Sequence, residues 1–360
     1  MPTIYVTTSG NDTTGTGTEA NPYLTISKAH AAASGGDTII INDNGTYNVV
    51  EGGANQVTTT PSSLKTDLNF KAGEGFSPVL DGGSSATYAF KCWHDWIIEG
   101  LTFRNFVDSS GGTGTGVIKQ YYSHNTGQVY DCVFHNITGA AINLQGAGTI
   151  AERNTIYDAY SFTAIYLGIA VDNTARNNII YNTAGRAIFA SQGIVEHNTI
   201  YNTPREVDFH STRTYAIHSK YVRYNIVEAA NVTIAGVRAL GTGAETRYNC
   251  VTGTYDSGGS SRYNYYNNVL GTGDIESSPQ FTDKDNGDFT LPISSPCFQG
   301  AHTSSVALDK QKFNRTWQYD DGVFSHNTSA NSEMGALEVH SARIMGVHTS
   351  DIAKILGNAG

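Results

Sequence analysis

Residues 152–157 read Glu-Arg-Asn-Thr-Ile-Tyr, and residues 196–201 read Glu-His-Asn-Thr-Ile-Tyr. Further segments share this pattern, and alignment on the third residue gives the series Asp131, Asn154, Asn178, Asn198, Asn225, Asn249 and Asn267. The steps along this series are 23, 24, 20, 27, 24 and 18 residues. A repeat of this length with β-forming residues in each unit is typical of a solenoid of stacked β-coils.

Each aligned column has a structural meaning, because equivalent residues of stacked coils lie above one another at about 4.8 Å. The asparagines are expected to form a ladder in which each side-chain amide bonds to the next. Two residues later an interior aliphatic stack is expected, made of Val133, Ile156, Ile180, Ile200, Val227, Val251 and Val269. Next comes an aromatic stack of Phe134, Tyr157, Tyr181 and Tyr201. Two residues before the asparagine lies a charged row of Glu152, Arg176, Glu196, Arg223 and Arg247.

A second strand in each coil is marked by a small residue followed by an aliphatic one. These aliphatic residues are Ile142, Ile165, Ile188, Ile217 and Val237, at steps of 23, 23, 29 and 20. The longer step indicates an insertion of about six residues in one coil. Because hairpin signals and crossover helices are missing, the pattern predicts an all-β, single-stranded parallel β-helix.

The ends of a solenoid need covering, since they expose unpaired strand edges. Residues 22–33 form a helical stretch near the start, and the apolar segment 38–41 follows it. We expect an N-terminal entry strand and capping helix in residues 1–45, β-helix coils in residues 46–300 and a C-terminal cap in residues 301–360. Residues 342–356 are predicted to form a tail helix within that cap.

The composition excludes several classes. The 360-residue chain has 39 glycines but 8 prolines, which argues against collagen and disordered linkers. No run of about 18 apolar residues occurs, so no membrane partner is expected. The net charge of −10 argues against nucleic-acid binding. The cysteines form no Cys-x-x-Cys pair, and free, mostly buried thiols are expected at Cys92, Cys132, Cys250 and Cys297.

Several segments resemble one known superfamily. The opening residues 5–12, 21–29 and 36–40 are similar to the entry segment of the pectate-lyase-like right-handed parallel β-helix superfamily. Residues 278–283, 287–291, 295–297 and 334–338 resemble its closing segment. The resemblance implies a right-handed parallel β-helix. The superfamily includes polysaccharide lyases, glycoside hydrolases, epimerases, phage tailspikes and non-enzymatic surface proteins, so the chemistry has to be read from site residues.

The outward members of the second strand form a predicted surface column of Asn143, Tyr166, Phe189, His218 and Arg238. Aromatic rings beside cations suit an acidic sugar chain, whose C–H faces stack on rings and whose carboxylates attract cations. The alternative is a row of ordinary exposed strand residues.

The inserted coil, residues 204–223, breaks the repeat with charge, since it holds four of the 22 Lys and Arg residues. Functional residues of solenoids tend to lie on such insertions. Substrate contacts are predicted for Arg205, His210 and Tyr215 on this insertion, and for Phe189, Asn143 and Arg186 outside it. The alternative is a solvated loop with internal salt bridges.

Removal of the C5 proton of a uronic acid needs a cation at the carboxylate, a base and a proton donor for the leaving oxygen. The candidates are Arg213 and Arg238 as cations, Lys220 or His218 as base, and Tyr166 or Tyr215 as donor. Residues 217–225 resemble the lysine-bearing strand of the alginate and chondroitin lyases of the superfamily, a resemblance that carries over to Lys220 alone. It also makes calcium the candidate cofactor. Where those enzymes place paired acidic ligands this chain has Arg213 and Tyr215, so the acidic candidates are Glu206 and Asp208 further back.

Three functions stay open. The first is a polysaccharide lyase that cleaves an acidic glycan by β-elimination, and the second is a non-catalytic glycan-binding or structural β-helix. The third, a glycoside hydrolase, needs two carboxylates about 5–5.5 Å or 6.5–9.5 Å apart. Glu206 and Asp208 form a candidate pair, whereas Glu196 already fits the charged row.

The expected setting is extracellular or on a virion. No basic and apolar targeting region opens the chain, and residues 346–357 are loosely similar to terminal segments of phage structural proteins. The expected partner is a polysaccharide, and the expected state is a monomer or a homotrimer, as in a tailspike.

Overall fold

The computed structural model describes residues 2–60, 66–108, 116–121, 126–160, 163–203, 214–228, 234–239, 244–252, 274–275, 277–292 and 294–297. It also describes the backbone of β26 (Ala301–His302), β27 (Trp317–Asp320), β28 (Val323–His326) and β29 (Asn331–Ser332). Some of the predictions concern residues outside the described ranges. These are the predictions for residues 204–213 and 253–273 and the predicted tail helix.

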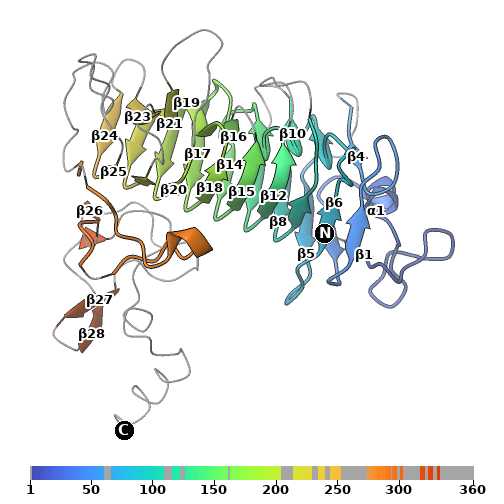
Figure 1. Cartoon of the computed structure of the whole chain (residues 1–360). Coiled ribbons are helices and arrows are strands. Elements are labelled where there is room, and N and C mark those ends of the chain that lie inside the picture. The colour runs from blue at the N-terminus through green and yellow to red at the C-terminus, as the bar shows by residue number, and fades with distance from the viewer. Residues whose placement is uncertain are drawn as a thin grey trace.

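The described strands stack into an elongated parallel β-helix with three faces (Figure 1). The first face contains β1 (Thr3–Val6), β2 (Thr38–Ile41), β5 (Leu68–Ala72), β8 (Trp96–Glu99), β11 (Gly127–Tyr130), β14 (Ile150–Glu152), β17 (Val171–Arg176) and β24 (Glu245–Arg247). The second contains β3 (Thr46–Asn48), β6 (Val79–Asp81), β9 (Thr102–Arg104), β12 (Val133–Thr138), β15 (Thr155–Tyr160), β18 (Ile179–Thr183), β20 (Thr199–Tyr201), β22 (Ile226–Glu228) and β25 (Cys250–Thr252).

The third face contains β4 (Val57–Thr58), β7 (Phe90–Cys92), β10 (Ile118–Gln120), β13 (Ile142–Leu144), β16 (Thr163–Tyr166) and β23 (Ile234–Ala239). Two long strands, β19 (Arg186–Glu196) and β21 (Thr214–Arg223), run from the third face onto the first, with an irregular register between them at the bend. The first and third faces are thereby joined into one 16-stranded sheet, beside the 9-stranded second face. The fold predicted from the repeat is confirmed.

The interior is filled by aligned apolar side chains. The column Ile142, Ile165, Ile188, Ile217 and Val237 is paired as predicted, and every member is buried. Burial of each such side chain contributes about 1.5–3 kcal/mol. Near the N-terminal end the interior columns switch to aromatic rings, and Phe103 stacks on Phe134 with centroids 4.9 Å apart.

The asparagine ladder is confirmed at the turn between the first and second faces. Each side-chain amide donates to the Oδ1 of the next, over 2.9–3.0 Å, along Asn154, Asn178, Asn198, Asn225 and Asn249, and Asp274 accepts the last bond. Each Oδ1 also accepts a backbone N–H, so the turn's polar groups are paired while fully buried.

The prediction that Asp131 is the first member of the ladder was wrong, because the ladder position lies one residue later. Cys132 holds the ladder position, because its backbone N–H donates to Asn154 Oδ1. Asp131 has φ +53, the left-handed turn conformation that also precedes every ladder asparagine, and its carboxylate pairs with Arg153 at 2.9 Å. The same shift places Phe134 rather than Val133 in the interior stack, and His135 rather than Phe134 beside Tyr157. The stacks are otherwise as predicted in the described coils.

The charged row is confirmed as well. Arg176 lies 2.9 Å from Glu152 and Arg223 lies 3.4 Å from Glu196, each pair joining neighbouring coils. Opposite charges directly across a strand pair are the favourable arrangement, so the row stabilises the stacking.

The N-terminal cap contains α1 (Ile26–Ala32), whose first turn is capped by the Thr25 side chain. This helix covers the end of the interior, with Ile26 and Ala29 buried, and β1 and β2 extend the first face. The predicted capping helix is confirmed. No helix in the described part of the chain is long and apolar enough to cross a membrane.

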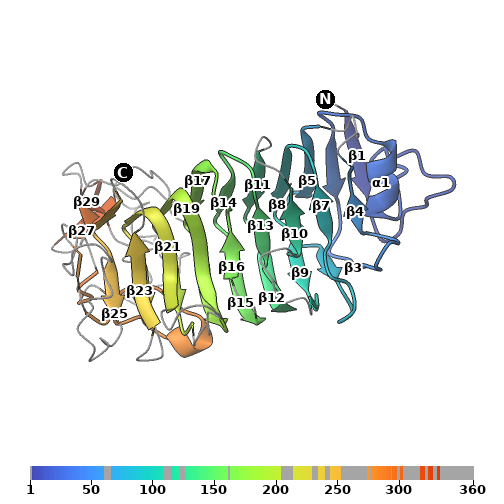
Figure 2. The same ribbon diagram turned by 90° about the horizontal axis from the view of Figure 1, so that it is seen from above.

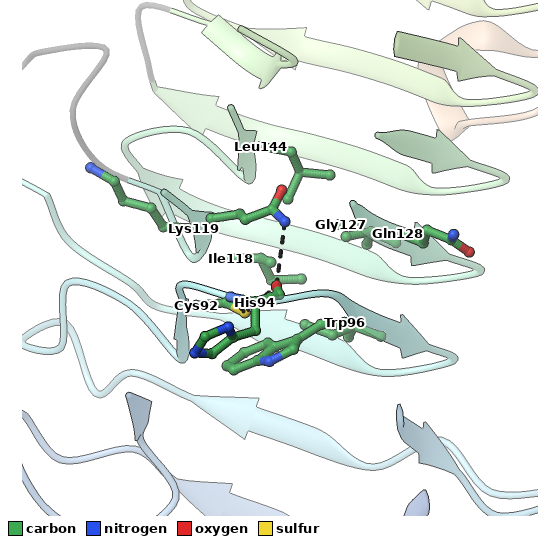
Figure 3. A pocket seen from close by; sticks show the side chains of 11 residues that line it. Cys92, His94, Trp96, Ile118, Lys119, Gly127, Gln128 and Leu144 are labelled. Atoms are coloured by element: carbon green, nitrogen blue, oxygen red, sulfur yellow. Dashed lines mark hydrogen bonds between the residues drawn. The ribbon is translucent and has the colours of Figure 1, made fainter. Parts of the chain in front are cut away.

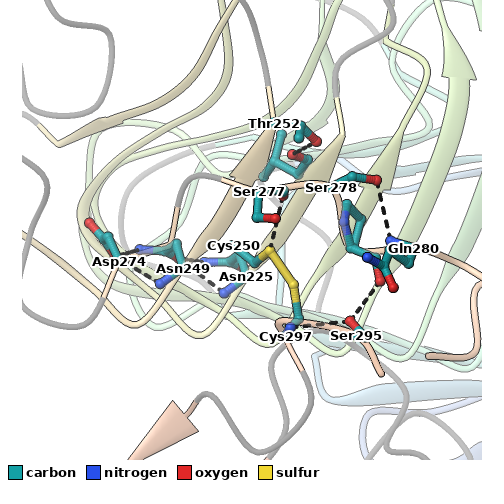
Figure 4. Close-up of a disulfide and its surroundings, with 12 residues drawn as sticks. Asn225, Asn249, Cys250, Thr252, Asp274, Ser277, Ser278, Gln280, Ser295 and Cys297 are labelled. Atoms are coloured by element: carbon teal, nitrogen blue, oxygen red, sulfur yellow. Dashed lines mark hydrogen bonds between the residues drawn. A yellow bond between two sulfur atoms is a disulfide. The ribbon is translucent and has the colours of Figure 1, made fainter. Parts of the chain in front are cut away.

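Near the other end the segment containing η1 (Lys284–Asn286) folds back over the second face (Figure 1). The hydroxyl of Tyr201 donates to Asp285 at 2.9 Å, and Phe289 packs against Tyr181 and Tyr201. Cys250 and Cys297 form a disulfide that ties this segment to β25 (Figure 4). The prediction of free thiols was therefore wrong for these two cysteines, which meet only after folding, and right for the buried Cys92 and Cys132.

Candidate functional site

The third-face strands β4, β7, β10, β13, β16, β19, β21 and β23 lie side by side (Figure 2), and one position on each of them forms a continuous row. Register places these residues opposite one another in the order Thr58, Lys91, Lys119, Asn143, Tyr166, Phe189, His218 and Arg238. The last five are the predicted surface column, so its alignment is confirmed. Lys91 and Lys119 were missed, although the triplets Phe90-Lys-Cys92 and Ile118-Lys-Gln120 carry the same apolar–outward–inward pattern.

A second row lies two residues further along each coil, where the third-face strands end. These residues lie two positions after Lys91, Lys119, Asn143, Tyr166 and Phe189 of the first row, and they are Trp93, Tyr121, Gln145, Gly168 and Ser191. Lys220 takes the corresponding place on β21, because it follows Ser219, which pairs with Ala190. The two rows border one strip of the third face, in which two lysines follow Thr58 near one end, and His218 and Lys220 lie one strand before Arg238 at the other.

The middle of the strip is a stack of rings. Tyr166 and Phe189 lie face to face with centroids 4.9 Å apart and planes 5° apart. The guanidinium carbon of Arg186 lies 5.2 Å from the centroid of the Phe189 ring. Because the two rings cover each other's faces, they offer edges and the Tyr166 hydroxyl to a ligand rather than an open stacking platform.

The Tyr166 phenol has a pKa above its usual value. Burial of the ring raises this pKa, and the positive charge of Arg186 opposes part of the rise. The phenol therefore stays protonated well above neutral pH, which suits a proton donor and not a base.

His218 and Lys220 lie on the same side of β21. Ser219 between them points inward, where its hydroxyl donates to the carbonyls of Ala190 and Gly193 at 2.9 Å each. Alternation along a strand then turns both neighbours outward. His218 is 8% exposed, and Lys220 is partly exposed with its ammonium 5.2 Å from the ring centroid of Tyr221.

The remaining predicted site residues are placed only in part. The backbone of Tyr215 pairs with Ala235 and that of Arg238 with His218. Asn143 is fully buried and His218 is nearly so, so the prediction of an exposed column is wrong at these two positions. Five predicted residues lie outside the described part of the chain: Arg205, Glu206, Asp208, His210 and Arg213.

The N-terminal part of the strip is rich in aromatic rings and lysines. Trp93 stacks on Tyr121 with centroids 4.6 Å apart and planes 17° apart. The ammonium of Lys119 lies 4.1 Å from the Tyr121 centroid, and that of Lys91 lies 5.5 Å from the same centroid. Lys91 also lies 5.3 Å from the ring centroid of Tyr88.

A cavity of about 10 Å³ lies behind these residues, inside the coil (Figure 3). Gln120 is among the residues that line it, and Figure 3 shows the side chain of Lys119 extending away from the other labelled residues. A cavity of this size holds about one water molecule, so it cannot take a sugar. Burial raises the pKa of the neighbouring Cys92 thiol, which is therefore not a nucleophile at neutral pH.

The metal prediction rests on residues that are not described. Within the described ranges no group of three or more His, Cys, Asp or Glu side chains is arranged to hold a metal ion.

Two family models match the chain. A Pel9A-like right-handed β-helix region matches residues 4–168, and a right-handed β-helix region matches residues 115–271. Together with the three-faced stack of parallel coils, these matches show that the chain belongs to the pectate-lyase-like right-handed parallel β-helix superfamily. Among curated proteins, none matches the sequence.

Solved structures give a similar picture of the fold. Pectate lyase Pel9A is 13% identical with a TM-score of 0.51, and the match covers 94% of this chain and 96% of that one. A rhamnogalacturonan lyase is 14% identical with a TM-score of 0.43, covering 71% and 75%. A complex of XylC with xylose is 14% identical with a TM-score of 0.46, covering 71% and 66%. At 13% identity the likeness to pectate lyase Pel9A supports the β-helix fold and no activity.

Proposed function

We propose that the protein is a polysaccharide lyase that binds an acidic, uronate-containing glycan along the third-face strip and cleaves it by β-elimination. The observation that carries the proposal is that Tyr166 lies in the same row as His218, with Lys220 two residues further along β21. Only β19, which carries Phe189, separates the strands of Tyr166 and His218. A base and a proton donor on one surface are what the reaction requires.

The roles follow from the chemistry. Lys220 or His218 takes the C5 proton of the uronate, and the electron pair expels the oxygen at C4 as the double bond between C4 and C5 forms. The Tyr166 hydroxyl gives that oxygen a proton. Since its pKa is raised, the phenol holds this proton until the leaving oxygen needs it.

A cation must stabilise the uronate carboxylate while it gains enolate character. Arg186 supports this role, because its guanidinium lies beside Phe189 in the middle of the strip. Arg238, whose backbone lies opposite His218, and Arg213 remain the further candidates. Calcium is the proposed cofactor, with Glu206 and Asp208 as its proposed ligands.

A hydrolase is less well supported. Glu196 is 4% exposed and paired with Arg223, so it serves the charged row. The outward row carries no carboxylate on any described strand, whereas hydrolysis needs two.

Mass spectrometry of the products tests the proposal. The protein is incubated with alginate, polygalacturonate, hyaluronan or chondroitin, with calcium or with a chelator. β-Elimination gives unsaturated fragments that are lighter by one water than the fragments of hydrolysis. Saturated fragments would support a hydrolase, and an uncleaved panel would support a glycan-binding or structural role. The chelator arm tests the calcium prediction.

The setting on a cell surface or virion, and the monomeric or trimeric state, belong to the same proposal. Size-exclusion chromatography with light scattering tests the oligomeric state. A trimer would support a tailspike-like depolymerase.

A further inference from the structure

Lys91 and Lys119 are opposite one another on β7 and β10, so two like charges stand about one strand spacing apart. Directly opposed like charges destabilise a strand pair. Their neighbours in the row, Thr58 and Asn143, are neutral and do not relieve the repulsion.

Lys119 is also buried, with 6% of its surface exposed. Within the described ranges neither lysine forms an ion pair, and their recorded partners are aromatic rings. An ammonium removed from water without an anion is costly, and a ring face replaces only part of the lost hydration. An anion bound beside the two ammonium groups would therefore be stabilised by both charges.

The surrounding rings fit a sugar. Trp93 and Tyr121 stack on each other beside the two ammonium groups, and the Tyr88 hydroxyl reaches the Thr58 hydroxyl at 3.1 Å. Aromatic surface combined with a few polar groups is the usual composition of a small-ligand site.

We propose that the partly exposed Lys91, reinforced by the charge of the buried Lys119 beside it, forms an anion-binding subsite for a carboxylate or sulfate of an acidic polysaccharide, flanked by Tyr121 and Trp93. Five strand steps separate Lys91 from His218, a distance of about 24 Å. The subsite holds the chain at that distance from the reacting sugar and takes no part in proton transfer. The identity of the ligand rests on the proposed function, but the binding of an oligosaccharide to the subsite can be measured without turnover.

The test uses isothermal titration calorimetry on the Lys220→Ala protein with oligogalacturonides of increasing length. Lys91→Gln and Lys119→Gln are each expected to weaken binding of long oligomers about tenfold, or ~1.4 kcal/mol. A disaccharide is expected to bind equally to all variants, because it cannot span the strip. The loss shrinks with added salt, since the contact is ionic.

Lys71→Gln is the matched control, a partly exposed lysine of β5 on the first face. It is expected to change neither affinity nor melting temperature. Lys119→Gln is expected to keep or raise the melting temperature, because it removes an unpaired buried charge. A fall in melting temperature with unchanged affinity would make Lys119 a packing residue and overturn the subsite.

The two proposals fail separately. Length-dependent binding that needs both lysines, in a protein that releases no unsaturated product, leaves the subsite standing and removes the lyase. Lyase activity with long oligomers bound equally well by the double variant removes the subsite. Equal weakening on neutral dextran would also overturn it, because an anion would then not be the recognised group.

Discussion

The imidazole of His218 meets the ring of Phe189 edge-on, with centroids 4.9 Å apart and planes at 71°. Phe189 stacks in turn on Tyr166, one strand further along the third face. One ring therefore fixes the positions of both the proposed donor and a proposed base. In the lyase account Phe189 is a positioning residue.

Phe189→Leu is expected to lower kcat on an acidic polysaccharide about tenfold while KM changes little. Leucine keeps the apolar contact but loses both ring contacts, each worth about 0.5–1.5 kcal/mol. Phe189→Tyr keeps the ring and is expected to retain most of the activity. Equal rates in the leucine variant and the wild type would show that Phe189 positions nothing.

Asn178→Ala is expected to destabilise the β-helix by roughly 3 kcal/mol. The change removes the Oδ1 that accepts from both the side-chain amide and the backbone N–H of Asn154. It also removes the donor to Ala151 O and one of the two donors to Asn198 Oδ1, all in a buried turn. Chemical denaturation measures the loss. Asn136→Ala, at an exposed turn position of β12, is the control and is expected to cost less.

The repeat made much of this fold predictable, since ladder, charged row and outward column all follow from alignment at one residue per coil. The error at Asp131 has a physical cause. Aspartate tolerates the left-handed turn position and asparagine fills the ladder, so Asp131-Cys132 imitates the motif one residue early. The disulfide could not be predicted, because Cys250 and Cys297 are 47 residues apart and are joined only by the folding back of the C-terminal segment.

The site was predictable where the repeat is regular. Tyr166, Phe189 and His218 were found because Ala-Ile precedes each of them. Lys91 and Lys119 were missed because their coils carry Ala-Phe and Val-Ile instead, and aromatic residues fill the interior near the N-terminal end. The burial of Lys119 beside Lys91 depends on how the coils pack in three dimensions, which the spacing of residues in the sequence does not show.

Reduction of the disulfide is expected to lower stability by roughly 2–4 kcal/mol, since it frees a long loop in the unfolded chain. A reductant should lower the melting temperature of the wild type and leave that of the Cys250→Ala, Cys297→Ala double variant unchanged. Alkylation of the denatured, unreduced chain should modify Cys92 and Cys132 only. Modification of all four cysteines would contradict the bond.

Acid is expected to destabilise the N-terminal coils. Burial alone would raise the pKa of Asp81, but hydrogen bonds from Asn105 and Gly83 and the ion pair with Arg104 outweigh it and lower this pKa below 3.8. A lowered folded-state pKa stabilises the protein above the unfolded pKa, and this contribution is lost as the pH falls through the folded value. The melting temperature should therefore fall below about pH 4, and less steeply in Asp81→Asn. Parallel pH profiles of the two proteins would contradict this assignment.

Cleavage by β-elimination is measured by the absorbance of the unsaturated product at about 235 nm during incubation with polygalacturonate and alginate, with Lys220→Ala and His218→Ala beside the wild type. A steady rise is expected for the wild type, and a fall in rate of about 10²–10⁴-fold in the variant that lacks the base. A flat wild-type trace, or a rise that both variants keep, would contradict the lyase proposal.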